Sequence, residues 1–391
     1  MPKRIVIIGA GPIGLEAALY ARTLGHEVIV FERGDIADSV AKWSFARLFS
    51  PWLMCITSLG HKAVQEVASA VPIDQIPTGR DFRELYLLPL AQAPILHGTL
   101  REHTEVLSIR KEPNHSAGFQ IRVKDPAGQQ YTEHADVLLD CSGTFGNFRW
   151  AGDNDRPAPG EEALQDRIFH TIPDVLGHDR ARFANRHTLL IGCNYASAMV
   201  LRDLKDLVAN CPHTAVTWAV RRPDQPVHPV LNDPLHARGR LVESTLRMLE
   251  HPPAWLRFLS TAVLQSITAN GTTFHTVFHS NGKFACLMPD EIVSLVGYRP
   301  DISIYSQLQL QTTYATTGPI KLTASLLSDT TVDGLVTEAD MTGSTKPEPT
   351  FFLLGAKSYG PNSNFLLQAG HMQICDAFRM IEGKADLDLY E

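Results

Sequence analysis

Arg4-Ile5-Val6-Ile7-Ile8 runs directly into Gly9-Ala10-Gly11-Pro12-Ile13-Gly14, and this stretch decides the fold. The first five residues predict a buried strand, and the glycines follow the G-x-G-x-x-G pattern of a turn that opens a helix. In that pattern Gly9 permits the tight turn, Gly11 lets the backbone approach a pyrophosphate, and Gly14 lets the helix pack closely on the strand. The stretch therefore predicts a dinucleotide-binding βαβ unit. Its binding turn comprises Gly9, Gly11, Pro12, Ile13 and Gly14.

The second strand of this unit, residues 28–31, ends at Glu32 and Arg33. A predicted helix over residues 15–24, closed by Gly25, joins the two strands. A carboxylate about 20 residues after the fingerprint can accept hydrogen bonds from a ribose 2′-hydroxyl, and it repels a 2′-phosphate. We therefore expect FAD or NAD here and not NADP, with Glu32 and Arg33 among the binding residues.

The order strand, turn, helix, strand recurs near the middle of the chain, over residues 188–220. Its turn begins at Gly192, but Asn194 stands where the second glycine would be. Asparagine tolerates a left-handed backbone better than most side chains, so we expect the turn to form.

Two arginines follow the last strand of this second unit, at the place where the first unit has its acid. Guanidinium groups suit a 2′-phosphate, so this unit is expected to prefer NADPH over NADH. The alternative is a structural Rossmann-like unit with an ordinary basic turn. The candidate binding residues are Gly192, Asn194, Tyr195, Ser197, Arg221 and Arg222.

Length and composition describe an ordinary globular protein with 391 residues, 44% hydrophobic and 20% charged. A net charge of −7 offers no basic surface for nucleic acid, and no apolar stretch reaches the roughly 18 residues of a membrane span. The first residues enter a core strand without a cleavable signal, so we expect a cytoplasmic location. A homodimer is possible with this sequence. The six cysteines form no C-x-x-C, which argues against a disulfide framework, a metal site and a redox-active dithiol.

Two further segments run from a strand into a turn of small residues, 133–144 and 291–297, and the second continues as Gly297-Tyr298-Arg299-Pro300-Asp301. With the fingerprint, this pattern resembles the two-dinucleotide-binding-domain flavoproteins over essentially the whole chain. The resemblance implies an α/β fold: an FAD-binding Rossmann-like domain of three layers (ββα), with an inserted NADPH-binding Rossmann-like domain. The expected ranges are 1–155 and 297–391 for the FAD domain and 156–296 for the NADPH domain, with a helical insertion at about 226–267.

The resemblance also implies positions for the cofactor FAD. Ser142 and Gly143 would lie by its pyrophosphate, and Val106 would meet the adenine through its backbone. A helix capped by Ser363 or Asn364 and running to Met380 would point its N-terminus at the flavin pyrimidine edge. An ordinary capped helix is the alternative there. From this C-terminal region we expect cofactor contacts from Gly355, Asn364, Phe365 and Leu366.

Within this superfamily the sequence favours the class B-like monooxygenases of the N-hydroxylating and flavin monooxygenase type. A disulfide reductase needs a thiolate pair, which the cysteine spacing does not offer. Ala356 stands where the reductases have an Asp after Gly355, and the monooxygenases commonly lack that Asp. Of the monooxygenase motif before the second fingerprint, only His170 matches.

Two regions are candidates for the substrate side. The loop from Trp43 to Trp52 follows the first βαβ unit. Trp43, Arg47 and Trp52 are expected to face flavin or substrate, with packing between domains as the alternative. Within the insertion we predict helices over 240–250 and 254–267, which would form a pocket wall or a dimer contact.

The function expected from these features is NADPH-driven oxygenation of a small molecule by dioxygen, at nitrogen, sulfur or carbonyl carbon, through a C4a-hydroperoxyflavin. Asn364 or Asn362 could hydrogen-bond the ring or the peroxide, and Arg47 is the third catalytic candidate. The first alternative is an NADPH-dependent flavoprotein reductase that feeds a quinone, a ferredoxin or another acceptor. The second is a nucleotide-binding sensor without catalysis.

Overall fold

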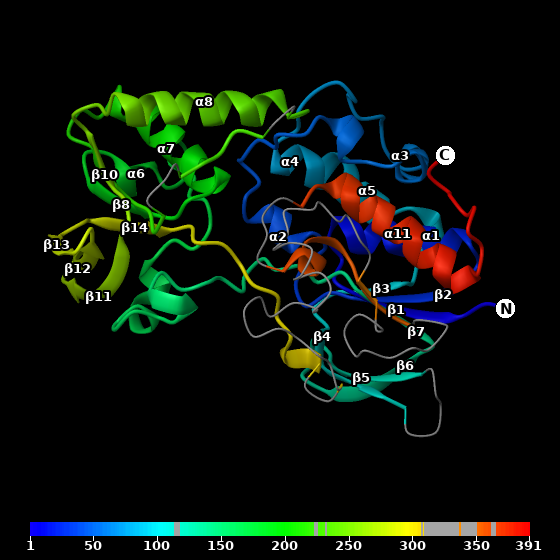
Figure 1. Ribbon diagram of the computed structural model, residues 1–391. Coiled ribbons are helices and arrows are strands. Elements are labelled where there is room, and N and C mark those ends of the chain that lie inside the picture. Colours follow the sequence, from blue (N-terminus) through cyan, green and yellow to red (C-terminus); the bar gives the residue numbers. More distant parts are fainter. Residues whose placement is uncertain are drawn as a thin grey trace. The chain divides into compact units, whose positions relative to one another are not determined.

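The computed structural model describes residues 1–112, 118–222, 226–230, 233–305, 308, 336–337, 350–360 and 365–391. The chain divides into two compact units (Figure 1). The first joins Met1–Asn147 to Arg299–Glu391, and the second is the continuous range Phe148–Tyr298.

A six-stranded sheet forms the middle of the first unit. Its strand order is β15-β16-β7-β1-β2-β3. In that order the strands are Val336–Thr337, Phe351–Leu353, Val137–Asp140, Arg4–Ile8, Glu27–Phe31 and Leu100–Arg101. Strand β1 pairs in parallel with both neighbours, and Ile8 lies opposite Phe31 on β2 and Asp140 on β7. The carboxyl ends of these strands therefore meet at one edge, where ligands bind in open α/β sheets.

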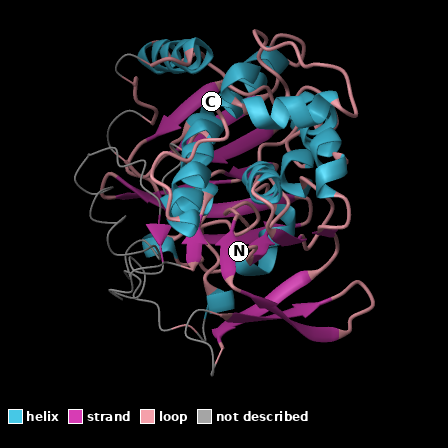
Figure 2. Ribbon diagram, turned by 90° about the vertical axis from the view of Figure 1, so that its right-hand side faces the viewer, coloured by secondary structure: helices cyan, strands magenta, loops and turns pink. Residues whose placement is uncertain are grey.

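Two layers cover this sheet, an antiparallel sheet on one face and helices on the other (Figure 2). The antiparallel layer consists of β4 (Glu105–Lys111), β5 (Phe119–Lys124) and β6 (Gln130–Ala135). Alternate residues of both sheets bury one apolar cluster between them, which includes Val6 and Phe119. This arrangement confirms the predicted three-layer ββα architecture.

Two long helices form the core of the helical layer. Helix α1 (Pro12–Thr23) is buried from Ile13 to Ala21 because it packs between the sheet and α11 (Leu367–Glu382). Tyr20 and Phe378 stack between them with ring centres 4.9 Å apart. The shorter helical segments are α2 (Asp38–Ala41), α3 (Ser58–Gln65), α4 (Gly79–Phe82), α5 (Leu88–Ala91), a π turn (Arg83–Leu87) and 3-10 turns (Trp52–Met54, Pro94–Leu96, Ser303–Tyr305, Gly355–Tyr359).

The second unit repeats the plan of a parallel sheet with a crossover helix. Its four strands follow the order β10-β9-β8-β14, all parallel. They are Leu256–Leu259, Ala215–Ala219, His187–Ile191 and Glu291–Ser294. Its helices are α6 (Arg180–Phe183), α7 (Tyr195–Val208) and α8 (His236–Glu250), with 3-10 turns at Asp153–Asp155 and Glu162–Arg167. An antiparallel sheet of β11 (Val263–Asn270), β12 (Thr273–Ser280) and β13 (Lys283–Leu287) completes the unit.

The structure corrects one predicted helix and confirms another. Helix α8 contains the predicted helix over 240–250. The predicted helix over 254–267 is wrong, because this stretch forms β10 and the start of β11. Residues 256–259 pair with β9 at the edge of the parallel sheet, and this pairing outweighs the helical spacing of the apolar residues. Among the described residues of the insertion, only α8 is helical.

Among the helices that the structure describes, none has the length and hydropathy that a bilayer crossing requires.

Candidate functional site

Two glycines of the first fingerprint, Gly9 and Gly14, lie so close to neighbouring backbone atoms that no side chain fits there. Gly9 has φ +95°, and a Cβ there would lie 2.9 Å from the carbonyl oxygen of Cys141 and 2.9 Å from the Cα of Ser142. A Cβ on Gly14 would lie 1.9 Å from the carbonyl oxygen of Gly9. The turn can therefore form only with glycine at both positions.

Gly11 differs, because no atom of the described residues requires it to be glycine. Its backbone is extended (φ −81°, ψ −172°), and a Cβ there would meet none of those atoms within 4 Å. Helix α1 starts from Gly11 without a side-chain cap and without an acidic residue in its first turn, as far as the described residues show. Open space beside uncapped backbone N–H groups is what a bound pyrophosphate requires.

Glu32, directly after β2, forms hydrogen bonds with the backbone around the same turn. Its carboxylate accepts hydrogen bonds from the N–H of Ala10 at 2.8 Å and from the N–H of Gly34 at 2.9 Å. A carboxylate has about four acceptor positions, so both oxygens keep capacity for a ribose hydroxyl. The ribose contact of Glu32 stays a prediction, and its two hydrogen bonds to the turn were not predicted from the sequence. Arg33 beside it is exposed.

Ser142 and Gly143 follow β7 at the same sheet edge. The N–H of Ser142 donates to Asp140 Oδ1 at 2.9 Å, and Gly143 has φ +68°. Sequence reasoning missed Asp140, although an acid at the end of the apolar strand 137–139 was a visible signal. It also missed Lys357, which forms a buried ion pair with Asp140.

The remaining predicted contacts of the first unit lie on several elements. Val106 is half-buried on β4. Gly355 has φ +71°, and a Cβ there would lie 3.2 Å from Ile13 in the fingerprint helix. Phe365 and Leu366 immediately precede α11, which starts at Leu367. Asn362 and Asn364, together with the proposed cap Ser363, lie outside the described residues.

The loop after the first βαβ unit is held by backbone hydrogen bonds and side-chain contacts with residues 73–79. The Arg47 guanidinium donates to the carbonyl oxygen of Ile76 at 3.0 Å. The half-buried Trp43 ring lies 2.6 Å from where a Cβ of Gly79 would be. Trp52 is 1% exposed in the core, which favours packing over a flavin contact for this residue.

In the second unit Asn194 forms the turn in another way than expected. Its backbone is extended (φ −150°), so the left-handed conformation that we expected is wrong. Its side chain caps α7 by accepting from the N–H of Ser197 at 3.0 Å, and it donates to the carbonyl oxygen of Leu295 at 2.6 Å. Gly192 before it has φ +133° and lies so close to Leu295 that a Cβ would be 2.2 Å from that carbonyl oxygen. Tyr195 opens the helix, and Arg238 lies 5.4 Å from its ring centre.

The two arginines after β9 differ in their contacts. Arg221 donates to the carbonyl oxygens of Ala151 at 3.1 Å and Gly152 at 2.6 Å. The buried carboxylate of Glu161 accepts N–H bonds from the same loop. Arg221 and Arg222 are both exposed beyond the end of β9, so they differ in these carbonyl contacts and not in exposure. Arg222 is therefore the better placed of the two for an external phosphate.

His170 lies in an aromatic cluster of the second unit. Its ring stacks on Phe148 at 3.6 Å between centres, and Trp150 meets it edge-on. The Tyr298 hydroxyl donates to the His170 carbonyl oxygen at 3.0 Å. Burial lowers the pKa of His170 to about 4, so the imidazole is neutral at physiological pH.

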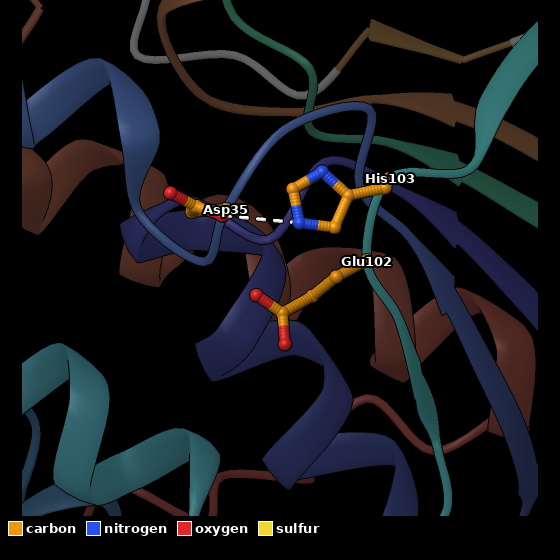
Figure 3. Close-up of side chains that lie close together, drawn as sticks. All are labelled: Asp35, Glu102 and His103. Atoms are coloured by element: carbon orange, nitrogen blue, oxygen red, sulfur yellow. Dashed lines mark ion pairs between the residues drawn. The ribbon is translucent and has the colours of Figure 1, made fainter. Parts of the chain in front are cut away.

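Figure 3 shows a further group near the end of β2, formed by Asp35, Glu102 and His103. His103 Nε2 lies 3.1 Å from Asp35 Oδ1, and Glu102 accepts the N–H of Ile36. All three side chains are exposed, and exposed acidic groups of this kind are common without an ion. We assign no metal to them.

Comparison with known proteins agrees with the fold. The family described as "Pyridine nucleotide-disulphide oxidoreductase" matches residues 6–148. The solved bacillithiol disulfide reductase Bdr of Bacillus cereus is 18% identical with a TM-score of 0.73, covering 98% of this chain and 100% of that one. The ornithine N-hydroxylase of Kutzneria sp. 744 is 16% identical with a TM-score of 0.65, covering 98% and 100%. The chain therefore shares the fold of these two solved proteins.

A sequence relative of this chain is the kynurenine 3-monooxygenase of Aspergillus clavatus, 37% identical over 210 residues. The match covers 48% of this chain and only 38% of that protein.

Proposed function

We propose that the chain is an FAD-dependent, NADPH-consuming monooxygenase that uses dioxygen to oxygenate a small molecule. The observation that carries the proposal is the first fingerprint turn, where Gly11 leaves open space beside uncapped backbone N–H groups. The sequence relative named as a monooxygenase and the solved N-hydroxylase with the same fold support the choice of reaction.

The chain's own groups would bind and orient the two nucleotides. Glu32 would accept a hydrogen bond from the FAD ribose hydroxyl, and the α1 N-terminus would stabilise the pyrophosphate. The Gly192 turn and Arg222 would hold NADPH on the second unit. When bound, FAD supplies hydride transfer and the activation of dioxygen, which no side chain can provide.

The cysteines of the first unit argue against a dithiol mechanism. Burial raises the pKa of Cys55 and Cys375 to about 12, and that of Cys141 well above its ordinary value. These groups are thiols at neutral pH, whereas the nucleophile in disulfide exchange is the thiolate. All six cysteines are free in the structure.

The alternative to a monooxygenase is an NADPH-dependent reductase that transfers electrons to a quinone, a ferredoxin or another acceptor without oxygenation.

The test is to reduce the purified protein anaerobically with NADPH and then to admit oxygen in a stopped-flow spectrometer. A monooxygenase should show a long-lived absorbing species between reduced and oxidised flavin, and substrate should accelerate NADPH consumption. A suitable panel contains an amine such as ornithine, a thioether, a ketone and kynurenine. Immediate return to oxidised flavin with every compound would favour the reductase, and no reduction by NADPH would contradict the second nucleotide site.

Replacing Arg222 with alanine should raise the KM for NADPH roughly tenfold to a hundredfold, because one charge-assisted contact to the 2′-phosphate is lost. The KM for NADH, which has no such phosphate, should stay unchanged. Steady-state kinetics with both nucleotides check this.

Arg221→Ala is the matched control for Arg222→Ala. Its guanidinium binds the carbonyl oxygens of Ala151 and Gly152, so the expected effect is a lower Tm and similar changes with both nucleotides. Equal changes in the two KM values for Arg222→Ala would contradict its assignment to the 2′-phosphate.

A further inference from the structure

A buried ion pair lies at the end of β7, beside the first nucleotide turn. Lys357 Nζ is 2.8 Å from Asp140 Oδ2, and the two side chains are 1% and 0% exposed. Removing two charges from water costs several kcal/mol per ion, and apolar residues of similar size often stabilise a fold as well or better. Stability of the fold alone is thus a weak explanation for this pair.

Both members of the pair bind Ser142. Asp140 Oδ1 accepts the N–H of Ser142 at 2.9 Å, and Lys357 Nζ donates to Ser142 Oγ at 3.0 Å. The Tyr305 hydroxyl donates to Asp140 Oδ2, and the Lys357 ammonium lies 4.9 Å from the Tyr305 ring centre. Backbone and hydroxyl of Ser142 are therefore both fixed by this one buried group.

Lys357 is held in place by a second set of buried contacts. It lies on the turn after β16, whose Leu353 pairs with Asp140. Gln373 of α11 accepts the N–H of Gly355 at 2.9 Å and donates to Ser358 Oγ at 2.9 Å. The turn that carries the ammonium is thus anchored on both sides of Lys357.

The direction of the Ser142 hydroxyl follows from the chemistry of the ammonium. A protonated lysine can only donate, so Ser142 Oγ must accept, and its own hydrogen points elsewhere. Among the described residues we find no acceptor for that hydrogen, and Ser142 is exposed. Its Cα lies 2.9 Å from where a Cβ of Gly9 would be, so the hydroxyl lies directly beside the fingerprint turn.

We propose that Lys357, held by Asp140, is a positioning residue that makes the Ser142 hydroxyl a fixed hydrogen-bond donor to an anionic oxygen of the bound dinucleotide. In the proposed function that oxygen belongs to the FAD pyrophosphate, and the inference rests on this assignment. The buried pair acts on ligand binding only through Ser142.

The test measures the Kd of FAD for the apoprotein by flavin fluorescence. Ser142→Ala should raise the Kd roughly tenfold or more, the effect expected for one hydrogen bond to a charged group. The double variant Asp140→Asn/Lys357→Met removes both charges together, so that neither is left buried alone, and it should raise the Kd by a similar factor. Adding Ser142→Ala to the double variant should have little further effect, because both changes remove the same bond.

Two controls separate this role from a structural one. Asp233→Asn/Arg238→Met removes a comparably buried pair, 10% and 9% exposed, in the second unit and should leave the Kd of FAD unchanged. Ser142→Thr keeps the hydroxyl and should retain most of the affinity. The Tm of each apoprotein reports folding. If the double variant does not fold, Lys357→Met alone is tested for the same loss of FAD affinity, and the contrast between Ser142→Ala and Ser142→Thr still tests the hydroxyl.

The outcomes distinguish the inference from the function beneath it. Wild-type protein that binds no FAD would overturn the proposed function and the inference together. Wild-type binding with an unchanged Kd for Ser142→Ala or for the folded double variant would overturn the inference alone. Multiplicative effects of the two changes would also overturn it, because the ammonium would then act by another route.

Discussion

Gly11→Leu should give a folded protein that carries no flavin, with FAD affinity lowered by at least a hundredfold. The backbone at Gly11 is extended and precedes a proline, which a leucine accommodates. Within the part of the chain that the structure describes, no atom would lie within 4 Å of the leucine Cβ. The side chain would instead occupy the space that the pyrophosphate needs, and it would prevent the close approach of the backbone N–H groups. The visible absorbance of the purified variant and the Kd of FAD measure the loss, and circular dichroism and the Tm of the apoprotein measure folding.

Gly14→Ala is the matched comparison for Gly11→Leu. A single added methyl group there would lie 1.9 Å from the Gly9 carbonyl oxygen, so this small change should impair folding itself. A yellow Gly11→Leu protein would place the dinucleotide elsewhere, and an unfolded one would mean that Gly11 serves the fold and not the ligand.

Glu16→Gln should remove a large pH dependence of stability. Glu16 lies 1% exposed on α1, where Tyr86 and Thr57 donate hydrogen bonds to its carboxyl group. Burial raises the pKa of Glu16 from 4.5 to about 7. The unfolded chain therefore loses this proton near pH 4.5, while the folded protein keeps it until about pH 7.

The sign follows from this order of titration. The stabilising contribution of the protonated Glu16 is fully present below about pH 4.5 and is lost as the pH rises to about 7. The total loss is on the order of 3 kcal/mol, at about 1.4 kcal/mol per pH unit. Glutamine does not titrate, so the difference in Tm between variant and wild type should rise across this interval in favour of the variant.

Glu243→Gln is a control for the pH experiment, because the Glu243 side chain is 62% exposed on α8. Its Tm should follow the wild-type value at every pH. A Glu16→Gln profile parallel to wild type from pH 4.5 to 7 would contradict the raised pKa of Glu16.

The sequence alone predicted those features that depend on neighbouring residues. The requirement for glycine at positions 9 and 14 follows from the backbone of a single turn, which a G-x-G-x-x-G pattern encodes locally. The repetition of strand, turn, helix and strand likewise predicted the parallel pairs β1–β2 and β8–β9, because each βαβ segment is continuous in sequence. The second site was predicted less well: Asn194 was correctly placed in the turn but given the wrong backbone conformation.

Contacts between distant segments could not be predicted in this way. The stretch over 254–267 has helical spacing of its apolar residues, and only the open edge of β9 makes its first part a strand. Arg221 and Arg222 are equivalent in sequence. In the tertiary structure, however, the Arg221 guanidinium donates hydrogen bonds to the carbonyl oxygens of Ala151 and Gly152.

The sequence by itself determined the fold and the position of the first fingerprint turn, because glycine patterns and hydrophobic periodicity act over a few residues. The tertiary structure decided which polar groups are buried together. Asp140 and Lys357 are 217 residues apart and meet because β16 is inserted beside β7, which no local pattern encodes. Burial of Glu16 likewise depends on Thr57 and Tyr86, which lie outside the βαβ unit.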